Sequence, residues 1–429
     1  MKLGMSRFDP YLKTYVESNN GSRLRDEIAD VWQSIRGTNL YSGGPRSSQT
    51  DRAIARSLAA LRIASQTNDR VLLAEACRLM AHTLNADEQY AESVEYYRKA
   101  IALFESGGSG EQAARTRLGF MAALYMMGKY DEAMEVAGAA ERWFQANNHP
   151  TGLAKVYSNI GNLNYRREQN QVALQYHSKA RVLFEQLKDW PALAMCYLNL
   201  ANGLSFTDQF KEAERMYNLS EEISAKLNMQ ELFMQARYNK SYLMFLQGRY
   251  VESIEAFKTV KEYFTKTSSW HHANLCDLDV AEIYLHLVQP ADAVAYAQRA
   301  AEGFSKTAMR YEYAKAIAFS AIGLAQLDRI EEAKQAAATA RQMFEGEGNR
   351  YWISILDFCL ANMELARGDV AKARLLSAQA KLQIQHMDIK GGMAESLSRL
   401  GSMALDSSQV KTVASCMTEV LKLTINKRR

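Results

Sequence analysis

The sequence repeats itself every 40 residues, and the register holds without gaps along most of the chain. One column of the repeat holds small residues: Ala53, Ser93, Ala133, Ala173, Ala213, Ser253, Ala293, Ala333, Ala373 and, in the last row, Val413. A second column, seven residues later, runs Ala60, Ala100, Ala140, Ala180, Ser220, Val260, Ala300, Ala340, Ala380 and Val420. So regular a period predicts a stack of similar units rather than several separate globular domains.

The columns have a physical interpretation as helix faces. Spacings of seven and four residues place side chains on one stripe of an α-helix. A third column, four residues after the second, holds phenylalanine at Phe104, Phe144, Phe184, Phe264, Phe304 and Phe344. Twelve residues before the first column, small residues recur at Ala81, Gly161, Ala201, Ser241, Ala281, Ala321, Ala361 and Gly401. We expect small side chains to let paired helices approach closely and phenylalanine to fill the gap at the next layer.

Turn signals divide each repeat into two helices. Glycine recurs in one column at Gly128, Gly248 and Gly368, and Pro150, Pro191 and Pro290 fall in or beside inter-helix loops. Each repeat is therefore expected to form two antiparallel helices of about 15 residues, for example Ala74–Ala86 and Ala91–Glu105. Only five prolines occur in 429 residues, and helix-forming residues dominate throughout. The sequence thus predicts an all-α protein.

These residues resemble the tetratricopeptide repeat. The family's order of a small residue, an aromatic residue and two alanines recurs as Ala81, Tyr90, Ser93, Tyr97 and Ala100, and again one hundred and twenty residues later from Ala201 to Ser220. The period exceeds that of the commoner tetratricopeptide repeat and is similar to that of the long-repeat subclass of Pins-type adaptors and of sensor arms in bacterial CHAT-protease-like proteins. The resemblance implies a right-handed superhelical solenoid of about ten antiparallel helix pairs.

The two ends depart from the regular pattern. Residues 1–66 are interpreted as irregular N-terminal capping helices, with one helix at Ser22–Ile35, and 67–429 as a continuous array of about nine repeats. The last predicted helix, Ser408–Thr424, carries valine where earlier repeats carry alanine, and no polar helix follows it. We expect this helix to pack on a further domain or on a second copy of the chain.

Charge and composition narrow the possible partners. The net charge is +4 with both signs interspersed, which argues against nucleic acid as a partner. No apolar stretch is long enough to span a membrane, and the N-terminus lacks the apolar core of a signal peptide. The odd number of cysteines without a Cys-x-x-Cys motif is typical of a reducing compartment. A cytoplasmic protein is therefore expected.

Motifs for catalysis, cofactors or metals are missing from the sequence. It contains neither the P-loop pattern GxxxxGK[ST] nor HExxH, and no GxGxxG follows a strand. The histidines do not have the spacing of a zinc site. Cys77, Cys196, Cys276 and Cys359 fall inside first helices, where a small apolar core role is expected. We predict a non-enzymatic protein without a cofactor.

A binding groove is the main functional hypothesis, because in the tetratricopeptide family the first helix of each pair lines the concave surface. One-face spacing places the following candidate residues on first helices: Arg115, Lys155, Asn159, Asn162, Arg166, Asn199, Asn202, Asn239, Tyr242, Asp279, Glu282 and His286. Asn159, Asn199 and Asn239 are each one repeat apart. A carboxamide both donates and accepts, so such a ladder suits the backbone of an extended peptide.

Three alternatives remain at this stage. The asparagines could instead bond adjacent helices and hold the superhelix. The chain could be the regulatory sensor arm of a larger signalling effector, such as a CHAT-type caspase-like protease. It could also be a scaffold that associates with itself through the C-terminal helix. The preferred hypothesis is an adaptor that binds an extended peptide or a partner protein segment.

Overall fold

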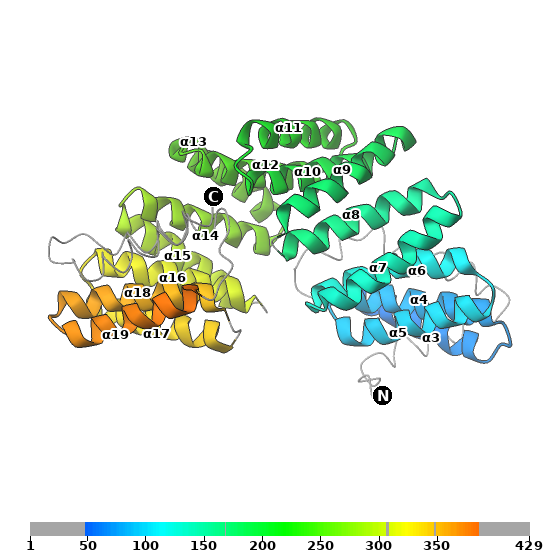
Figure 1. Cartoon of the computed structure of the whole chain (residues 1–429), viewed down its shortest axis with the longest axis horizontal. Coiled ribbons are helices and arrows are strands. Elements are labelled where there is room, and N and C mark those ends of the chain that lie inside the picture. Colours follow the sequence, from blue (N-terminus) through cyan, green and yellow to red (C-terminus); the bar gives the residue numbers. More distant parts are fainter. Residues whose placement is uncertain (1–47, 168, 306–308, 347–348, 386–429) are drawn as a thin grey trace. The chain divides into compact units, whose positions relative to one another are not determined.

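The computed structural model describes residues 48–167, 169–305, 309–346 and 349–385 (Figure 1). Within these ranges the chain forms 17 helices and no strand. The helices are α3 (Ser48–Ser65), α4 (Arg70–Ala86), α5 (Tyr90–Ser106), α6 (Gly110–Met126), α7 (Tyr130–Ala146), α8 (Pro150–Arg166), α9 (Asn170–Leu187), α10 (Trp190–Ser205), α11 (Phe210–Lys226), α12 (Gln230–Leu246), α13 (Tyr250–Lys266), α14 (Trp270–His286), α15 (Pro290–Ser305), α16 (Arg310–Gln326), α17 (Ile330–Gly346), α18 (Arg350–Ala366) and α19 (Val370–Gln385). The all-α helical-repeat fold is confirmed.

The helices follow the 40-residue period. The even-numbered helices α4 to α18 are the first helices of the repeats and begin at positions 70, 110, 150 and so on, while the odd-numbered second helices begin 20 residues later. Most helices have 17 residues, slightly more than expected. One reason is that capping residues start them early: the Asp69 carboxylate accepts a hydrogen bond of 3.0 Å from the Leu72 N–H.

The chain divides into two compact units. The first contains the described residues up to Leu204 together with Arg215–Leu232, and the second contains Ser205–Glu214 and the described residues from Phe233 onward. Within each unit, successive helices pack on one another, and some first helices also contact the next first helix, as α14 does α16 and α6 does α8. The predicted helices Ser22–Ile35 and Ser408–Thr424 lie outside the described residues.

A left-handed residue closes each turn between helices. Such residues recur at 20-residue intervals, for example Glu88, Gly108, Gly128 and Asn148, and their φ angles range from 49° to 84°. The next amide bonds back to the helix: Ser109 N–H donates to Phe104 O at 2.8 Å, and Lys129 N–H donates to Leu124 O at 3.0 Å. This is the Schellman pattern, which satisfies carbonyls at the helix end.

Val288 occupies this turn position although its side chain is β-branched. Its φ is 54°, and it is largely exposed. A left-handed conformation costs an L-residue about 1–2 kcal/mol, against about 0.5–1 kcal/mol of extra chain entropy for glycine. We therefore expect Val288→Gly to raise the free energy of unfolding by about 0.5–1 kcal/mol, measured by urea titration. The reverse change one repeat earlier, Gly248→Val, is the matched control and should be destabilising; a destabilising Val288→Gly would contradict this explanation.

Small side chains lie where first and second helices meet. The Ser93 hydroxyl donates to Ala81 O and the Ser253 hydroxyl donates to Ser241 O, both at 2.7 Å, so the two predicted columns are in direct contact. A Cβ added at Gly161 would lie 2.5 Å from the His177 ring. Burial lowers the pKa of His177 to about 4. The small residues therefore keep the helix pairs close, as the sequence predicted.

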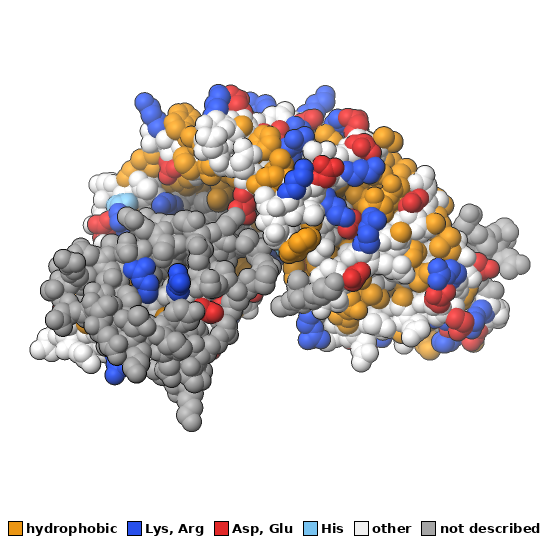
Figure 2. Space-filling model, turned by 180° about the vertical axis from the view of Figure 1, so that it is seen from behind, with side chains coloured by type: hydrophobic (Ala, Val, Ile, Leu, Met, Phe, Trp, Pro, Cys, Tyr) orange, Lys and Arg blue, Asp and Glu red, His pale blue; other side chains and the backbone are white. Residues whose placement is uncertain are grey.

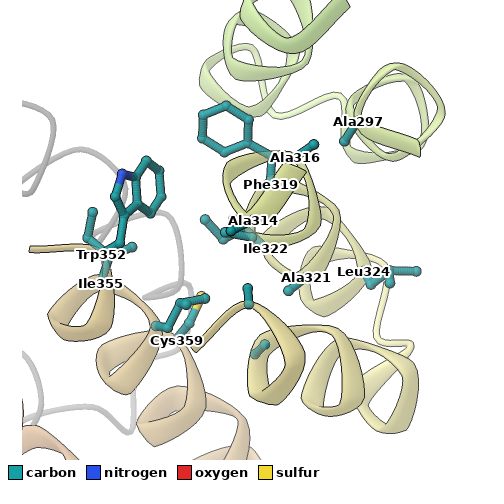
Figure 3. Close-up of a cluster of buried hydrophobic side chains, with 14 of the residues drawn as sticks. Ala297, Ala314, Ala316, Phe319, Ala321, Ile322, Leu324, Trp352, Ile355 and Cys359 are labelled. Atoms are coloured by element: carbon teal, nitrogen blue, oxygen red, sulfur yellow. The ribbon is translucent and has the colours of Figure 1, made fainter. Parts of the chain in front are cut away.

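The phenylalanine column is buried in both units. Exposure does not exceed 3% at Phe104, Phe144, Phe184, Phe264, Phe304 or Phe344. In the second unit the layer extends through Trp352, whose ring stacks on Phe344 at 5.5 Å and meets Phe319 edge-on at 5.7 Å. Figure 3 shows Phe319 on α16 and Trp352 on α18 above a floor of alanines and Ile322. The role predicted for this column, to fill the gap between layers, is thus observed.

Candidate binding surface on the first helices

In the first unit, the predicted basic residues lie on α6 and α8. Arg115 pairs with Glu111 at 2.8 Å, one turn earlier on the same helix. Lys155 is exposed. Arg166 Nε donates to the Tyr125 hydroxyl at 2.6 Å, and its guanidinium lies 5.5 Å from the centre of that ring. Arg166 is thereby held in place by α6, while Lys155 keeps its ammonium in solvent.

The asparagines of the first unit fall into two groups. Asn159 Nδ2 donates to Leu118 O on α6 at 3.4 Å, and Asn202 Oδ1 accepts from the Tyr217 hydroxyl of α11 at 2.7 Å. Asn162 and Asn199 are half-buried, and neither side chain is hydrogen-bonded within the described residues. The first pair therefore ties helices together, and the second pair keeps free donors and acceptors.

In the second unit, α12 and α14 carry the remaining candidates. Tyr242 on α12 is half-buried, with its ring centre 5.4 Å from that of Phe245. His286, at the end of α14, contacts Phe245 at 5.0 Å and stacks on Tyr250 at 6.4 Å. Asn239 is half-buried beside them on α12 and interacts with other groups of the chain. These residues form an aromatic surface with polar edges.

Asp279 and Glu282 are far more buried than solvated helix faces would be, with relative exposures of 6% and 4%. The Tyr238 hydroxyl on α12 donates to Asp279 Oδ2 at 2.5 Å, and Lys315 Nζ on α16 lies 3.3 Å from Glu282 Oε2. Burial raises the pKa of Asp279 to about 6, although Lys315 and the Tyr238 hydroxyl lower it. Burial opposes the charge of Lys315, but Glu282, Tyr242 and Asp279 outweigh it and raise the ammonium pKa.

The structure thus joins Asp279 and Glu282 to two residues that were not candidates, Tyr238 and Lys315. Lys315 has the same repeat position as the candidate Lys155, exactly four repeats earlier, so the shared register was the signal that could have found it. Two carboxylates face one ammonium in this cluster. The arrangement leaves an excess of negative charge on the first-helix side of the second unit.

The described residues offer little for catalysis. Cys77, Cys196, Cys276 and Cys359 are buried, and burial raises the thiol pKa of Cys77 to about 11 and those of Cys196 and Cys359 to about 12. Such thiols are poor nucleophiles at neutral pH. Within the same residues no group of three His, Cys, Asp or Glu side chains is placed to hold a metal ion.

Two further properties concern the surface and the helix lengths. Blue Lys and Arg side chains are interspersed with red Asp and Glu side chains over the face seen in Figure 2. None of the helices in the described ranges combines the length and apolar character needed to cross a bilayer.

Comparison with known proteins identifies the repeat. Residues 152–226 match the family model of the tetratricopeptide repeat. A search of curated protein sequences found no match. The chain is a helical-repeat protein of the tetratricopeptide type, and its resemblance to that family is confirmed.

Solved structures share the fold across most of the chain at low identity. The apo form of the quorum sensor NprR from B. thuringiensis is 12% identical, with a TM-score of 0.60, over 84% of this chain and 98% of that one. The Rap conjugation gene regulator of the plasmid pLS20, in complex with a peptide, is 14% identical, with a TM-score of 0.53, over 90% and 98%. Aspartyl phosphate phosphatase F from Bacillus subtilis is 13% identical, with a TM-score of 0.55, over 86% and 96%. At these identities the similarity shows the fold alone.

Proposed function

We propose that this chain is a non-enzymatic scaffold whose first helices bind an extended peptide or a segment of a partner protein. The observation that carries the proposal is the state of Asn162 and Asn199, whose carboxamides occupy repeat-related first-helix positions without hydrogen bonds among the described residues. A peptide backbone offers N–H and C=O groups that match these free donors and acceptors. One structural neighbour, the Rap regulator, is itself a peptide complex, which supports this class of ligand.

The other candidates have distinct roles in this proposal. Asn159, Asn202 and Asn239 extend the ladder along the first helices, and Tyr242 and His286 supply apolar contact. Arg115, Lys155 and Arg166 attract acidic ligand groups in the first unit, while Asp279 and Glu282 attract basic groups in the second. Opposite charges in the two units would fix the direction in which a peptide binds. The long-repeat interpretation of the family and a cytoplasmic location belong to the same proposal.

Binding of selected peptides tests the ladder. Peptides chosen from a displayed random library against the full chain would be labelled, and their affinity measured by fluorescence anisotropy. We expect the combined changes Asn159→Ala, Asn199→Ala and Asn239→Ala to weaken binding about 100-fold, since each lost contact costs about 1 kcal/mol.

The control removes three carboxamides from exposed positions on second helices, with Gln171→Ala, Gln175→Ala and Gln335→Ala. This variant should keep the affinity of the parent chain. Equal affinity of both triple variants would contradict the asparagine ladder.

A further inference from the structure

A hollow of about 500 Å³ lies in the second unit between α13, α14 and α15. Its α14 residues, Cys276, Asp277 and Val280, point away from the helix face that carries Asp279, Glu282 and His286. The hollow is therefore separate from the proposed peptide surface. Its volume falls in the range of about 300–1,000 Å³ typical of sites for small molecules. Its lining residues are Phe257, Lys258, Lys261, Glu262, Thr265, Lys266, Cys276, Asp277, Val280, Tyr296 and Arg299.

The charges of this hollow are unequal. The side chain of Asp277 is only 5% exposed, and it holds two cations: Lys261 Nζ lies 2.6 Å from Oδ2, and Arg299 Nη2 lies 3.5 Å from Oδ1. Glu262 also lines the hollow, and Lys258 pairs with Glu255 at its rim. Four cations thus face three carboxylates, so the hollow has one positive charge in excess. This balance favours an anionic occupant.

The remaining walls are apolar and aromatic. Phe257 and Val280 are buried, with exposures of 0% and 2%, and the Tyr296 ring lies beside them. The Arg299 guanidinium lies 3.9 Å from the centre of the Tyr296 ring, which holds its charge at the edge of this apolar surface. A flat apolar group can therefore lie inside while an attached anion reaches Arg299.

A repeat-related hollow in the first unit has the opposite charge balance. It lies between α5, α6 and α7, four repeats earlier, where Arg98, Arg117 and Phe120 replace Lys258, Asp277 and Val280. Arg117 pairs with Glu105, Arg98 pairs with Glu95 and Glu132, and Glu135 also lines the hollow. Two cations here face four carboxylates. The stacking of repeats thus produces both hollows, but of these two only the one in the second unit has excess positive charge.

We propose that the hollow between α13, α14 and α15 binds a small organic anion, an aromatic or similarly flat apolar body with one carboxylate. The apolar body lies against Phe257, Val280 and Tyr296. Its carboxylate pairs with Arg299, which Asp277 only partly neutralises. Lys266, at the end of α13, supplies a second cation within the lining.

Two probes with the same ring separate charge from apolar attraction. Isothermal titration would compare 2-naphthoate with 2-naphthylmethylammonium on the full chain. We expect saturable binding of about one naphthoate per chain at concentrations below about 1 mM, and at least tenfold weaker binding of the ammonium probe. Absence of saturable naphthoate binding, or equal binding of both probes, would overturn the proposal.

Variants place the probe in the hollow. Arg299→Gln should weaken naphthoate binding at least tenfold, and Thr265→Trp, which introduces a bulky ring from an exposed lining position, should block it. Arg98→Gln, at the repeat-related hollow of the first unit, is the matched control and should leave the affinity unchanged. Far-UV circular dichroism verifies that each variant folds. An equal loss in Arg98→Gln and Arg299→Gln, in folded proteins, would show that binding is not at this hollow.

Discussion

Replacing Lys315 by methionine is expected to lower the free energy of unfolding by about 3–5 kcal/mol at pH 7.5, because it removes the cation that faces two buried carboxylates. Glu282 and Asp279 are at least 94% buried, and Lys315 is the ammonium nearest to Glu282. Methionine keeps much of the apolar length of lysine, so lost packing contributes little. Urea titration measures the effect, and Lys258→Met, which breaks an exposed pair with Glu255, is the control.

The same variant should be less destabilised at pH 5. The folded-state pKa of Asp279 is about 6, above its value in an unfolded chain, so its ionisation opposes folding as the pH rises through this range. Without Lys315 this pKa should rise further, and protonation at pH 5 then relieves the repulsion with Glu282. A loss below 1 kcal/mol at pH 7.5, or one that is larger at pH 5, would contradict the description of this cluster.

Phe144→Ala is expected to lower the free energy of unfolding of the first unit by about 3–5 kcal/mol, since it deletes a fully buried ring from the layer between repeats. The ring packs against Trp143 and His149, with centroid distances of 5.4 and 5.1 Å. Rigid helices on both sides limit how far the site can collapse. Urea titration followed by tryptophan fluorescence would report the change, because Trp143 adjoins the cavity.

Val182→Ala provides the comparison for Phe144→Ala. Val182 lies on α9, two residues before the buried Phe184, and its side chain is 43% exposed. Its truncation should change stability by no more than about 0.5 kcal/mol. Similar losses in the two variants would mean that the phenylalanine column does not hold the layers together.

The repeat period carried most of the fold into the sequence. The columns through Ser93 and Ala81 predicted close helix contacts, and the Ser93 hydroxyl bonds the Ala81 carbonyl. Turns were predicted from glycine and proline, yet Glu88, Val288 and Asp328 adopt the same left-handed conformation as Gly128. Their position in the repeat, rather than their intrinsic preference, sets that geometry, so residue type alone could not predict it.

The candidate surface was harder to predict because side-chain partners come from neighbouring helices. Lys155 and Lys315 share a repeat position, but Lys155 is exposed and Lys315 contacts Glu282 on α14. Asn159 and Asn199 likewise share a position, and only Asn159 reaches a carbonyl of the preceding first helix. A periodic pattern places residues on a face, while burial and pairing depend on non-periodic residues opposite them. The CHAT-type alternative and the C-terminal contact stay predictions, since Ser408–Thr424 lies outside the described residues.

The binding role of the first helices is the central claim, and photo-crosslinking tests it most directly. A selected peptide carrying benzoylphenylalanine would be irradiated with the full chain, and the attachment sites mapped by mass spectrometry. The proposal predicts attachment to α8, α10, α12 or α14, with Met195 of α10 a favourable target because its side chain is 51% exposed. Attachment confined to the second helices α9, α11, α13 and α15 would contradict it.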